Sequence, residues 1–322
     1  MSLNKRFEQE SEKAFDNAEK RCCVLTFCAV LLRLSTKKHK INKTEKNMKL
    51  TYLGTGAAEG VPSLFCQCDN CKQSRALGGR NIRSRSQALI NDELLIDFPA
   101  DTFWHFIKYN FDCENICGCI ITHSHSDHLY PAEAEIAKPS LSHEHRVIKF
   151  YADKSGYDLL LRQVSQTNGN AAVHLIEVGK RFEIAGSRRY SVMPMRANHN
   201  ADSTPVIYSV ECEGKRVLYA HDSGYFLDET WELLAREGRF DLVSLDCTYC
   251  NLPNIEKNAR HMSLNVNLQV IERLKAQGNV DVNTILVANH FSHNGGTTYD
   301  AMSKASGAYG IITSYDGMTV EF

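Results

Sequence analysis

Three histidines and one aspartate stand within six residues of one another, directly after a short apolar run. The four ligand-type residues are His123, His125, Asp127 and His128. Imidazole and carboxylate groups hold zinc, iron or manganese in proteins. Side chains of a strand alternate between its two faces, so a strand alone cannot gather all four. We therefore expect the ligands to lie in a loop and the first turn of a helix after a strand, and the cluster predicts a metal-dependent hydrolase.

Three further ligand-type residues follow later in the chain, each just after a strand-like run. They are His199, Asp222 and His290. Alone, each would be an ordinary turn residue or a satisfied polar group. Together with the first cluster they supply five histidines and two carboxylates. This set is large enough for two metal ions that share a bridging carboxylate.

The composition indicates a globular protein without a strong overall charge. Of 322 residues, 43% are hydrophobic, and the formal net charge is −1. A net charge this small provides no overall positive potential that would attract long nucleic acid, so we expect a small substrate. The 12 cysteines are clustered beside metal-type histidines, unlike those of a small secreted disulfide scaffold. We therefore expect a reducing, cytoplasmic location.

Residues 1–47 differ from the rest of the chain and form a predicted leader, flexible or helical, whereas the predicted hydrolase domain covers residues 48–322. The leader is rich in Lys, Glu and Asn around one apolar stretch, Cys22 to Leu34. This stretch is shorter than the ~20 residues that cross a bilayer, and no cleavage pattern follows it. We expect, in this order, a non-native or misassigned leader, an appended amphipathic helix, or a membrane signal. No membrane partner is expected for the hydrolase domain.

Short apolar runs alternate with helical patterns from Met48 onward, which indicates an α/β (α+β) fold. The expected strands are 48–53, 87–97, 117–122, 147–152, 172–177, 189–194, 206–212, 215–220, 241–247, 284–289, 308–313 and 317–322. The expected helices are 99–109, 131–138, 154–166, 226–236, 263–276 and 298–306. Glu213-Gly214 and Asp316-Gly317 have the turn chemistry of two-residue hairpins, and Gly278 should end the helix before it.

The order H-x-H-x-D-H, then His, Asp and a final His, resembles the metallo-β-lactamase-fold hydrolases over residues 48–322. The resemblance implies a four-layer αββα sandwich with the site at one edge between two sheets. It implies a first metal held by His123, His125 and His199 and a second held by Asp127, His128 and His290. Asp222 would bridge the two metals.

A second cluster supplies three thiols as C-x-C-x-x-C, namely Cys66, Cys68 and Cys71. Three soft ligands need a fourth to complete a tetrahedral structural zinc site, and His293 is the candidate. With the segment Tyr52 to Gly56, this pattern resembles the PhnP-type cyclic phosphodiesterases, in which equivalent thiols and a late histidine bind a structural zinc. The expected cofactors are therefore two divalent catalytic ions, Zn²⁺ or Mn²⁺, and one structural Zn²⁺.

Other cysteine and histidine pairs are interpreted as structural. Cys247 and Cys250 follow an apolar strand, lack two further ligands nearby, and should be small apolar fillers. Cys113, Cys117 and Cys119 are expected to pack around a strand. His143-Glu144-His145 has no Asp-His after it and is expected in a solvated loop.

The expected chemistry is attack on phosphorus by hydroxide, which divalent metals supply by lowering the pKa of a bound water to about 7. The predicted catalytic residues are Asp127 and His261. The PhnP resemblance implies that a histidine in the region of His261 assists the phosphate, and His261 could protonate the leaving oxygen. Asp97, which closes an apolar run, could orient a ligand histidine, and the side chain of His221 should point away from that of Asp222.

The resemblance implies a small phosphodiester substrate, such as a cyclic ribose phosphate or nucleotide, and no long nucleic acid. One alternative is a nuclease like the tRNA 3′-processing endonucleases, which would need a long arm and a basic surface that the sequence lacks. Another is a zinc-stabilised module that binds a nucleotide without turnover. A homodimer is the assembly we would test first.

Overall fold

The computed structural model describes residues 47–199 and 203–322. Of the predicted leader, 1–47, all but the last residue lies outside the described residues, and so does its apolar stretch, Cys22 to Leu34. Among the described residues, no helix has both the length and the apolar character needed to cross a membrane.

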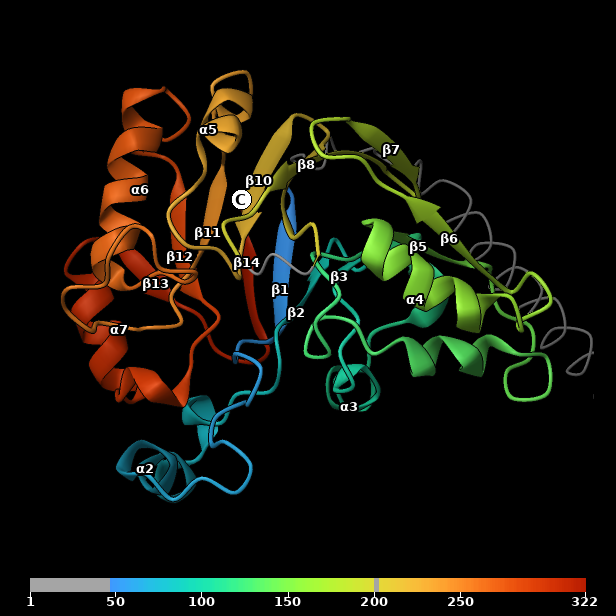
Figure 1. Cartoon of the computed structure of the whole chain (residues 1–322), viewed down its shortest axis with the longest axis horizontal. Coiled ribbons are helices and arrows are strands. Elements are labelled where there is room, and N and C mark those ends of the chain that lie inside the picture. The colour runs from blue at the N-terminus through green and yellow to red at the C-terminus, as the bar shows by residue number, and fades with distance from the viewer. Residues whose placement is uncertain (1–46, 200–202) are drawn as a thin grey trace, which may run out of the picture. The chain divides into compact units, whose positions relative to one another are not determined.

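Two seven-stranded sheets build the domain (Figure 1). The first has the order β14-β1-β2-β3-β4-β5-β6, with strands β14 (Met318–Glu321), β1 (Lys49–Gly54), β2 (Gln87–Ile90), β3 (Leu94–Ile96), β4 (Gly118–Ile120), β5 (Ile148–Ala152) and β6 (Ala171–Leu175). The second has the order β13-β12-β11-β10-β9-β8-β7, with strands β13 (Ile311–Thr313), β12 (Ile285–Asn289), β11 (Leu242–Asp246), β10 (Lys215–Ala220), β9 (Val206–Cys212), β8 (Arg189–Arg196) and β7 (Phe182–Ala185).

Helices cover the outer face of each sheet, which gives four layers (Figure 1). The first sheet carries α3 (Thr102–Tyr109), α4 (Lys154–Val164) and the 3-10 helix η3 (Pro131–Ala137), and the second carries α5 (Asp228–Leu234), α6 (Leu264–Ala276) and α7 (Tyr299–Gly307). One apolar core lies between the sheets and one lies under each helical layer. The predicted αββα sandwich is confirmed.

Parallel strands in both sheets deliver their carboxyl ends to one edge of the sandwich. Strands β3 to β6 are parallel to one another in the first sheet, and β10 to β13 are parallel in the second. Helices α5, α6 and α7 make the crossovers that parallel strands require. Residues that follow these strands therefore meet at the same place, which is where open α/β sheets bind ligands.

Several local predictions need correction. The expected strand 87–97 is a hairpin of β2 and β3, because Asn91 and Asp92 adopt positive φ values of 51° and 59° and turn the chain. The segment 131–138 forms a 3-10 helix rather than an α-helix. Besides short 3-10 helices, one strand and one α-helix were missed: β7, and α2 (Asp69–Leu77), whose N-cap is Cys68.

The two predicted hairpin turns have different outcomes. Glu213-Gly214 does join the antiparallel strands β9 and β10. Asp316-Gly317 does not join a hairpin, because β13 pairs in the second sheet and β14 in the first. Asp316 instead accepts hydrogen bonds from Thr55 Oγ1 (2.6 Å) and Ser84 N (2.7 Å), which fixes the crossing between sheets. Gly278, with φ 78°, follows the end of α6 as predicted.

The core assignment can be tested with two phenylalanines. Phe150 in β5 is fully buried, whereas Phe103 on α3 is 60% exposed. We expect Phe150→Ala to lower the free energy of unfolding by about 3–5 kcal/mol, because it removes a large side chain and leaves a cavity. Phe103→Ala should change it by less than about 0.5 kcal/mol. Urea unfolding of the full chain measures both values, and equal losses would contradict the assignment.

Candidate metal centre

The predicted ligands meet at the shared edge of the two sheets. His123 to His128 follow β4, His199 follows β8, Asp222 follows β10 and His290 follows β12. The first cluster lies entirely in a loop, so the predicted turn of helix after β4 is wrong. The loop lets successive side chains converge, which the alternating faces of a strand would prevent.

The first group contains His123, His125, His199 and Asp222, whose donor atoms all lie within 4.8 Å of one another. His125 Nδ1 is 2.9 Å from His123 Nε2 and 3.3 Å from His199 Nε2. Asp222 Oδ2 is 3.2 Å from His123 Nε2. Three imidazoles and a carboxylate oxygen thus face one point.

The second group contains Asp127, His128, Asp222 and His290, again with donor atoms within 4.8 Å of one another. Asp222 Oδ2 is 2.9 Å from His128 Nε2, and Asp127 Oδ2 is 3.2 Å from the same nitrogen. Asp222 belongs to both groups, which is the position that a bridging ligand requires. Both Asp222 and His290 have positive φ values, 51° and 62°, and such strained backbone often accompanies functional sites.

The donor set fits divalent cations. Nε2 of His290 is buried, makes no hydrogen bond with the described residues, and lies 3.7 Å from Asp222 Oδ2. Leaving such an atom unpaired costs free energy, and a cation bound to it would remove that cost. Imidazole nitrogens with carboxylate oxygens suit zinc, manganese and iron alike. The cluster is therefore a divalent-metal-binding site.

The charges of the group also suit a cation. Burial would raise the pKa of Asp222, yet His290, His123 and His128 hold that pKa well below its ordinary value. Burial lowers the pKa of His199 to about 4, so its ring is neutral and keeps a free lone pair at pH 7. An ionised carboxylate and a neutral imidazole such as that of His199 are the protonation states that bind metals. Burial would lower the pKa values of His128 and His290, but neighbouring carboxylates instead raise them, so these two rings release a proton when a cation binds.

Two carboxylates behind the group orient its histidines. Asp97, after β3, accepts a hydrogen bond from His128 Nδ1 at 2.6 Å and another from Thr122 N at 2.7 Å. The predicted contact through which Asp97 orients a ligand histidine is thus present. Asp246 closes β11 and lies 3.4 Å from His290 Nδ1, which is 2.9 Å from Thr248 Oγ1, itself 3.0 Å from Asp246 Oδ2. Each contact leaves Nε2 of its histidine for the metal, as in other metal sites.

Asp246 was missed by sequence reasoning, although a signal existed. It closes the apolar strand Leu242–Asp246 in the same way that Asp97 closes Leu94–Ile96. Its carboxylate also accepts hydrogen bonds from Thr248 N at 3.0 Å and Met262 N at 2.8 Å. These contacts fix the segment that carries His261.

His261 lies beside the bridging carboxylate. Its Nδ1 is 3.1 Å from Asp222 Oδ1 and 3.2 Å from Asp246 Oδ2. Burial lowers the pKa of the ring, but Asp246 and then Asp222 outweigh it and raise the pKa to about 9. Its Nε2 has no partner among the described residues. His221, by contrast, stays outside the donor groups, with Nε2 2.7 Å from Ser244 Oγ, in agreement with the prediction that its side chain points away from that of Asp222.

A pocket of about 350 Å³ opens over these residues. It is lined by Ala57, Ala58, Glu59, His125, Asp127, His199, Asp222, Thr248, Tyr249, His261, His290, Ser292 and Asn294. None of these described lining residues is Lys or Arg. The site thus offers metal ligands, the imidazole of His261 and neutral or acidic groups.

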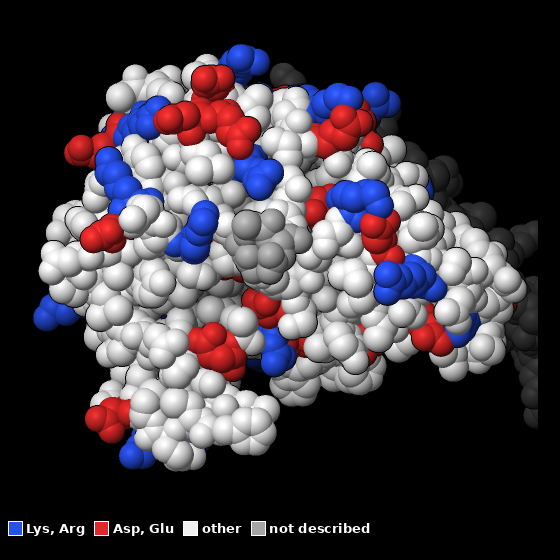
Figure 2. Space-filling view, viewed as in Figure 1, with Lys and Arg blue, Asp and Glu red and all other residues white. Residues whose placement is uncertain are grey.

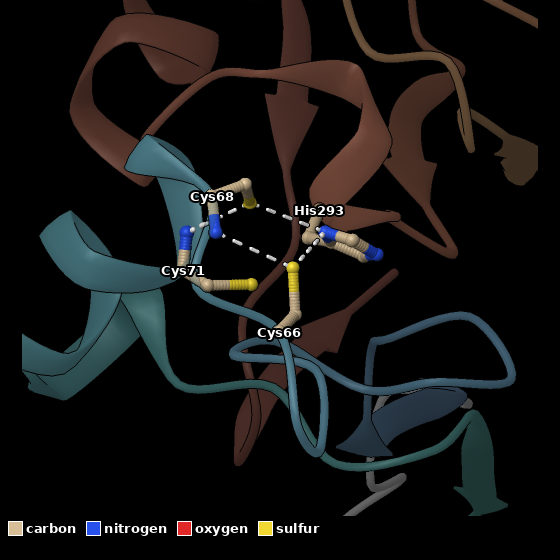
Figure 3. A group of neighbouring side chains, drawn as sticks. All are labelled: Cys66, Cys68, Cys71 and His293. Carbon is tan, nitrogen blue, oxygen red and sulfur yellow. Dashed lines mark hydrogen bonds between the residues drawn. The ribbon is translucent and has the colours of Figure 1, made fainter.

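The residues of the second predicted cluster also come together, around the N-terminus of α2 (Figure 3). His293 Nδ1 lies 3.4 Å from Cys68 Sγ and 3.6 Å from Cys66 Sγ, and Cys71 completes the group. In tetrahedral zinc sites with Zn–S near 2.3 Å, donor atoms stand about 3.5–3.8 Å apart. The hydrogen bond with His293 is the main cause that lowers the pKa of Cys68 to about 6, which favours the thiolate.

The predictions for the remaining cysteines and histidines are confirmed in part. Cys247 and Cys250 are buried among apolar side chains, as predicted. Cys119 is buried and Cys117 half-buried, but Cys113 is exposed on the 3-10 helix η2 (Cys113–Asn115), so its predicted packing role is wrong. Residues 143–145 lie in a loop outside helix and strand, as expected.

Comparisons with solved structures support the fold. A diphosphatase of the PhnP family has 21% sequence identity and a TM-score of 0.64, covering 86% of this chain and 97% of its own. Zinc-bound PqqB from Methylobacterium extorquens has 18% identity and a TM-score of 0.62, covering 84% and 99%. The short form of human tRNase Z has 18% identity and a TM-score of 0.54, covering 84% and 98%. Identities this low establish the fold alone.

The sequence comparisons identify the family. No curated protein matches the chain. The family model described as a beta-lactamase superfamily domain matches residues 101–282, a span that includes His123 to His128, His199, Asp222 and His261. The chain therefore belongs to the beta-lactamase superfamily and is a metal-dependent hydrolase with the metallo-β-lactamase fold.

Proposed function

We propose that the protein is a phosphodiesterase that hydrolyses a small phosphodiester, such as a cyclic ribose phosphate or a cyclic nucleotide. The observation that carries this proposal is the position of Asp222, shared by two donor groups and paired with His261. Two cations on either side of a bridging carboxylate match the two-metal arrangement that stabilises attacking and leaving oxygens in phosphoryl chemistry.

Two divalent ions, Zn²⁺ or Mn²⁺, would occupy the site. His123, His125 and His199 would hold the first ion, Asp127, His128 and His290 the second, and Asp222 both. Bound there, the ions would lower the pKa of a water molecule and polarise the phosphate oxygens. Asp127 would contribute to catalysis as a ligand, since its carboxylate faces His128 Nε2.

His261 would protonate the leaving oxygen. Its Nδ1 faces the carboxylates of Asp222 and Asp246, which favour the protonated ring and leave Nε2 as the atom available to a substrate. A positioned imidazolium supplies a proton to a poor leaving group in the transition state. The ring lines the pocket, within reach of a bound ester.

The cysteine cluster would bind a structural Zn²⁺. Three sulfurs and one imidazole nitrogen form a closed four-ligand set with no position left for a substrate, as in structural zinc sites. Such an ion would join the loop of Cys66 and Cys68 to the segment after β12 that carries His293.

The surface favours a small substrate over tRNA. The face seen in Figure 2 has Lys and Arg interspersed with Asp and Glu, without a continuous basic area. No Lys or Arg lines the pocket among the described residues. A tRNA nuclease needs many cationic contacts with phosphates. We further propose a cytoplasmic protein, because the cysteines of the described part are free, and a homodimer.

Removing the shared carboxylate should abolish hydrolysis. We expect the full chain, loaded with Mn²⁺ or Zn²⁺, to hydrolyse bis(p-nitrophenyl) phosphate and Asp222→Ala to show no detectable turnover, because both donor groups lose a ligand. Asp228→Ala changes an exposed aspartate and should retain wild-type rates. Absorbance of released p-nitrophenolate measures the rates. A metal-loaded wild type with no activity would favour the nucleotide-binding module without turnover.

Removing His261 should weaken hydrolysis according to the leaving group. His261→Ala should lower kcat by about 10²–10⁴ for 2′,3′-cyclic AMP, whose alkoxide needs a proton. The loss should be smaller for bis(p-nitrophenyl) phosphate, because p-nitrophenolate leaves readily without protonation. Steady-state rates and metal content by atomic emission are measured together. Equal losses on both substrates, or loss of metal, would contradict proton donation.

Disrupting the group of Cys66, Cys68, Cys71 and His293, the thiol cluster, should lower the stability of the fold more than the rate of hydrolysis. We expect Cys68→Ser to lose about one zinc ion per chain and to lower Tm, since structural zinc contributes to folding free energy. Cys113→Ser, which changes an exposed cysteine outside the cluster, is the matched control. Zinc analysis and scanning calorimetry measure the result. Unchanged zinc content and Tm in Cys68→Ser would argue against a structural site.

A further inference from the structure

One wall of the metal pocket is shared with the thiol cluster. Glu59 lines the pocket, and its side chain is 28% exposed. Its Oε1 accepts a hydrogen bond from Ser292 Oγ and lies 3.6 Å from His293 Nε2. The same His293 turns its Nδ1 to the sulfurs of Cys66 and Cys68 (Figure 3). A single imidazole therefore faces the zinc ligands on one side and a pocket residue on the other.

The loop that carries Glu59 is fixed by backbone contacts. Ala57 N donates to Phe291 O at 2.9 Å, and Gly60 N donates to Ala57 O at 2.9 Å. Arg85 Nε donates to Ala58 O at 2.9 Å. These bonds hold the backbone on both sides of Glu59, so the direction of its side chain is set chiefly by Ser292 and His293.

The carboxylate of Glu59 keeps one oxygen for a ligand. Both contacts of Glu59 involve Oε1, and Oε2 has no partner among the described residues. No Lys or Arg lines the pocket in the described part, and the sequence of residues 200–202 contains none either. An ionised carboxylate accepts hydrogen bonds and cannot donate them. It therefore attracts a hydroxyl group and repels a second anionic group.

The thiol cluster determines how His293 presents its other nitrogen. With Nδ1 directed at the sulfurs, as a zinc ligand would be, the neutral ring carries its hydrogen on Nε2. At 3.6 Å this Nε2–H is beyond hydrogen-bond distance of Glu59 Oε1, so it adds an electrostatic contact to the hydrogen bond from Ser292 Oγ. The cluster thus stabilises one position of the Glu59 side chain.

We propose that Glu59 selects the organic group of the substrate, accepting a hydrogen bond from a ribose-type hydroxyl, and that Ser292 and His293 position it. This inference rests on the phosphodiesterase function proposed above. The preferred substrate carries a single phosphodiester charge and a neutral, hydroxyl-bearing group. A substrate with a further phosphate is disfavoured, because that phosphate would approach the Glu59 carboxylate with no Lys or Arg among the described lining residues to offset the repulsion.

The test compares each substrate with its deoxy analogue. The probes are 2′,3′-cyclic AMP with its 5′-deoxy analogue and 3′,5′-cyclic AMP with its 2′-deoxy analogue. The wild-type enzyme should prefer at least one hydroxyl-bearing member by about 10–100-fold in kcat/KM, mainly through KM, as a hydrogen bond to a charged group predicts. Glu59→Ala should bring that ratio close to 1. Glu183→Gln, which changes an exposed glutamate on β7, should keep the wild-type ratio.

A second pair of variants tests the positioning role. His293→Cys offers a fourth thiolate, so it should retain zinc but loses the imidazole that contacts Glu59, and its selectivity ratio should fall at least threefold. Ser292→Ala removes the hydrogen-bond donor to Glu59 and leaves all four zinc ligands, so it gives the same test if His293→Cys loses zinc. Zinc content and Tm report whether the fold and the cluster survive.

The outcomes separate this inference from the proposed function. A wild type that hydrolyses phosphodiesters, with the same selectivity ratio in Glu59→Ala, would refute the role of Glu59 and leave the phosphodiesterase intact. A metal-loaded wild type that hydrolyses none of the probes would refute the proposed function and this inference with it. Full selectivity in both Ser292→Ala and zinc-containing His293→Cys would refute the positioning role alone.

Discussion

The buried carboxylate of Asp222 is the interaction on which the site depends. Burying a negative charge is costly unless opposite charge or strong donors surround it. Here Oδ2 lies 2.9 Å from His128 Nε2 and 3.2 Å from His123 Nε2. On its other side Oδ1 lies 3.1 Å from His261 Nδ1. Because Asp222 follows β10 at the centre of the second sheet, every segment that supplies a histidine must end at the same edge.

Both sheets meet this requirement through the same arrangement of strands and aspartates. Each contains parallel strands whose carboxyl ends lie at the site, and each closes one strand with an aspartate, Asp97 after β3 and Asp246 at the end of β11. Asp97 holds His128 by Nδ1 directly, and Asp246 acts on Nδ1 of His290 together with Thr248, so both rings direct Nε2 at Asp222. The strand ends position the aspartates, and the loops that follow carry the ligands.

The sequence predicted those features that depend on short-range pattern. The motifs H-x-H-x-D-H and C-x-C-x-x-C each place several donor residues within one short segment. His199, Asp222 and His290, later in the chain, complete the first set, and His293 completes the second. The orienting contact of Asp246 depends on β11 lying between β10 and β12, which no local pattern encodes. The Asp316-Gly317 turn was misread for the same reason, because β13 and β14 pair in different sheets.

The end of β12 links the two clusters. His290 faces Asp222, and His293, three residues later, faces the sulfurs of Cys66 and Cys68. Ser292, between them, holds Glu59 at the pocket wall. One short segment therefore carries a residue of each donor group and a contact with the pocket wall. Its backbone is bonded through Phe291 to the loop of Glu59, so closing the thiol cluster restricts the same wall of the pocket. If the proposed zinc ion and phosphodiester substrate are correct, an ion remote from the reacting phosphate would influence which substrate binds.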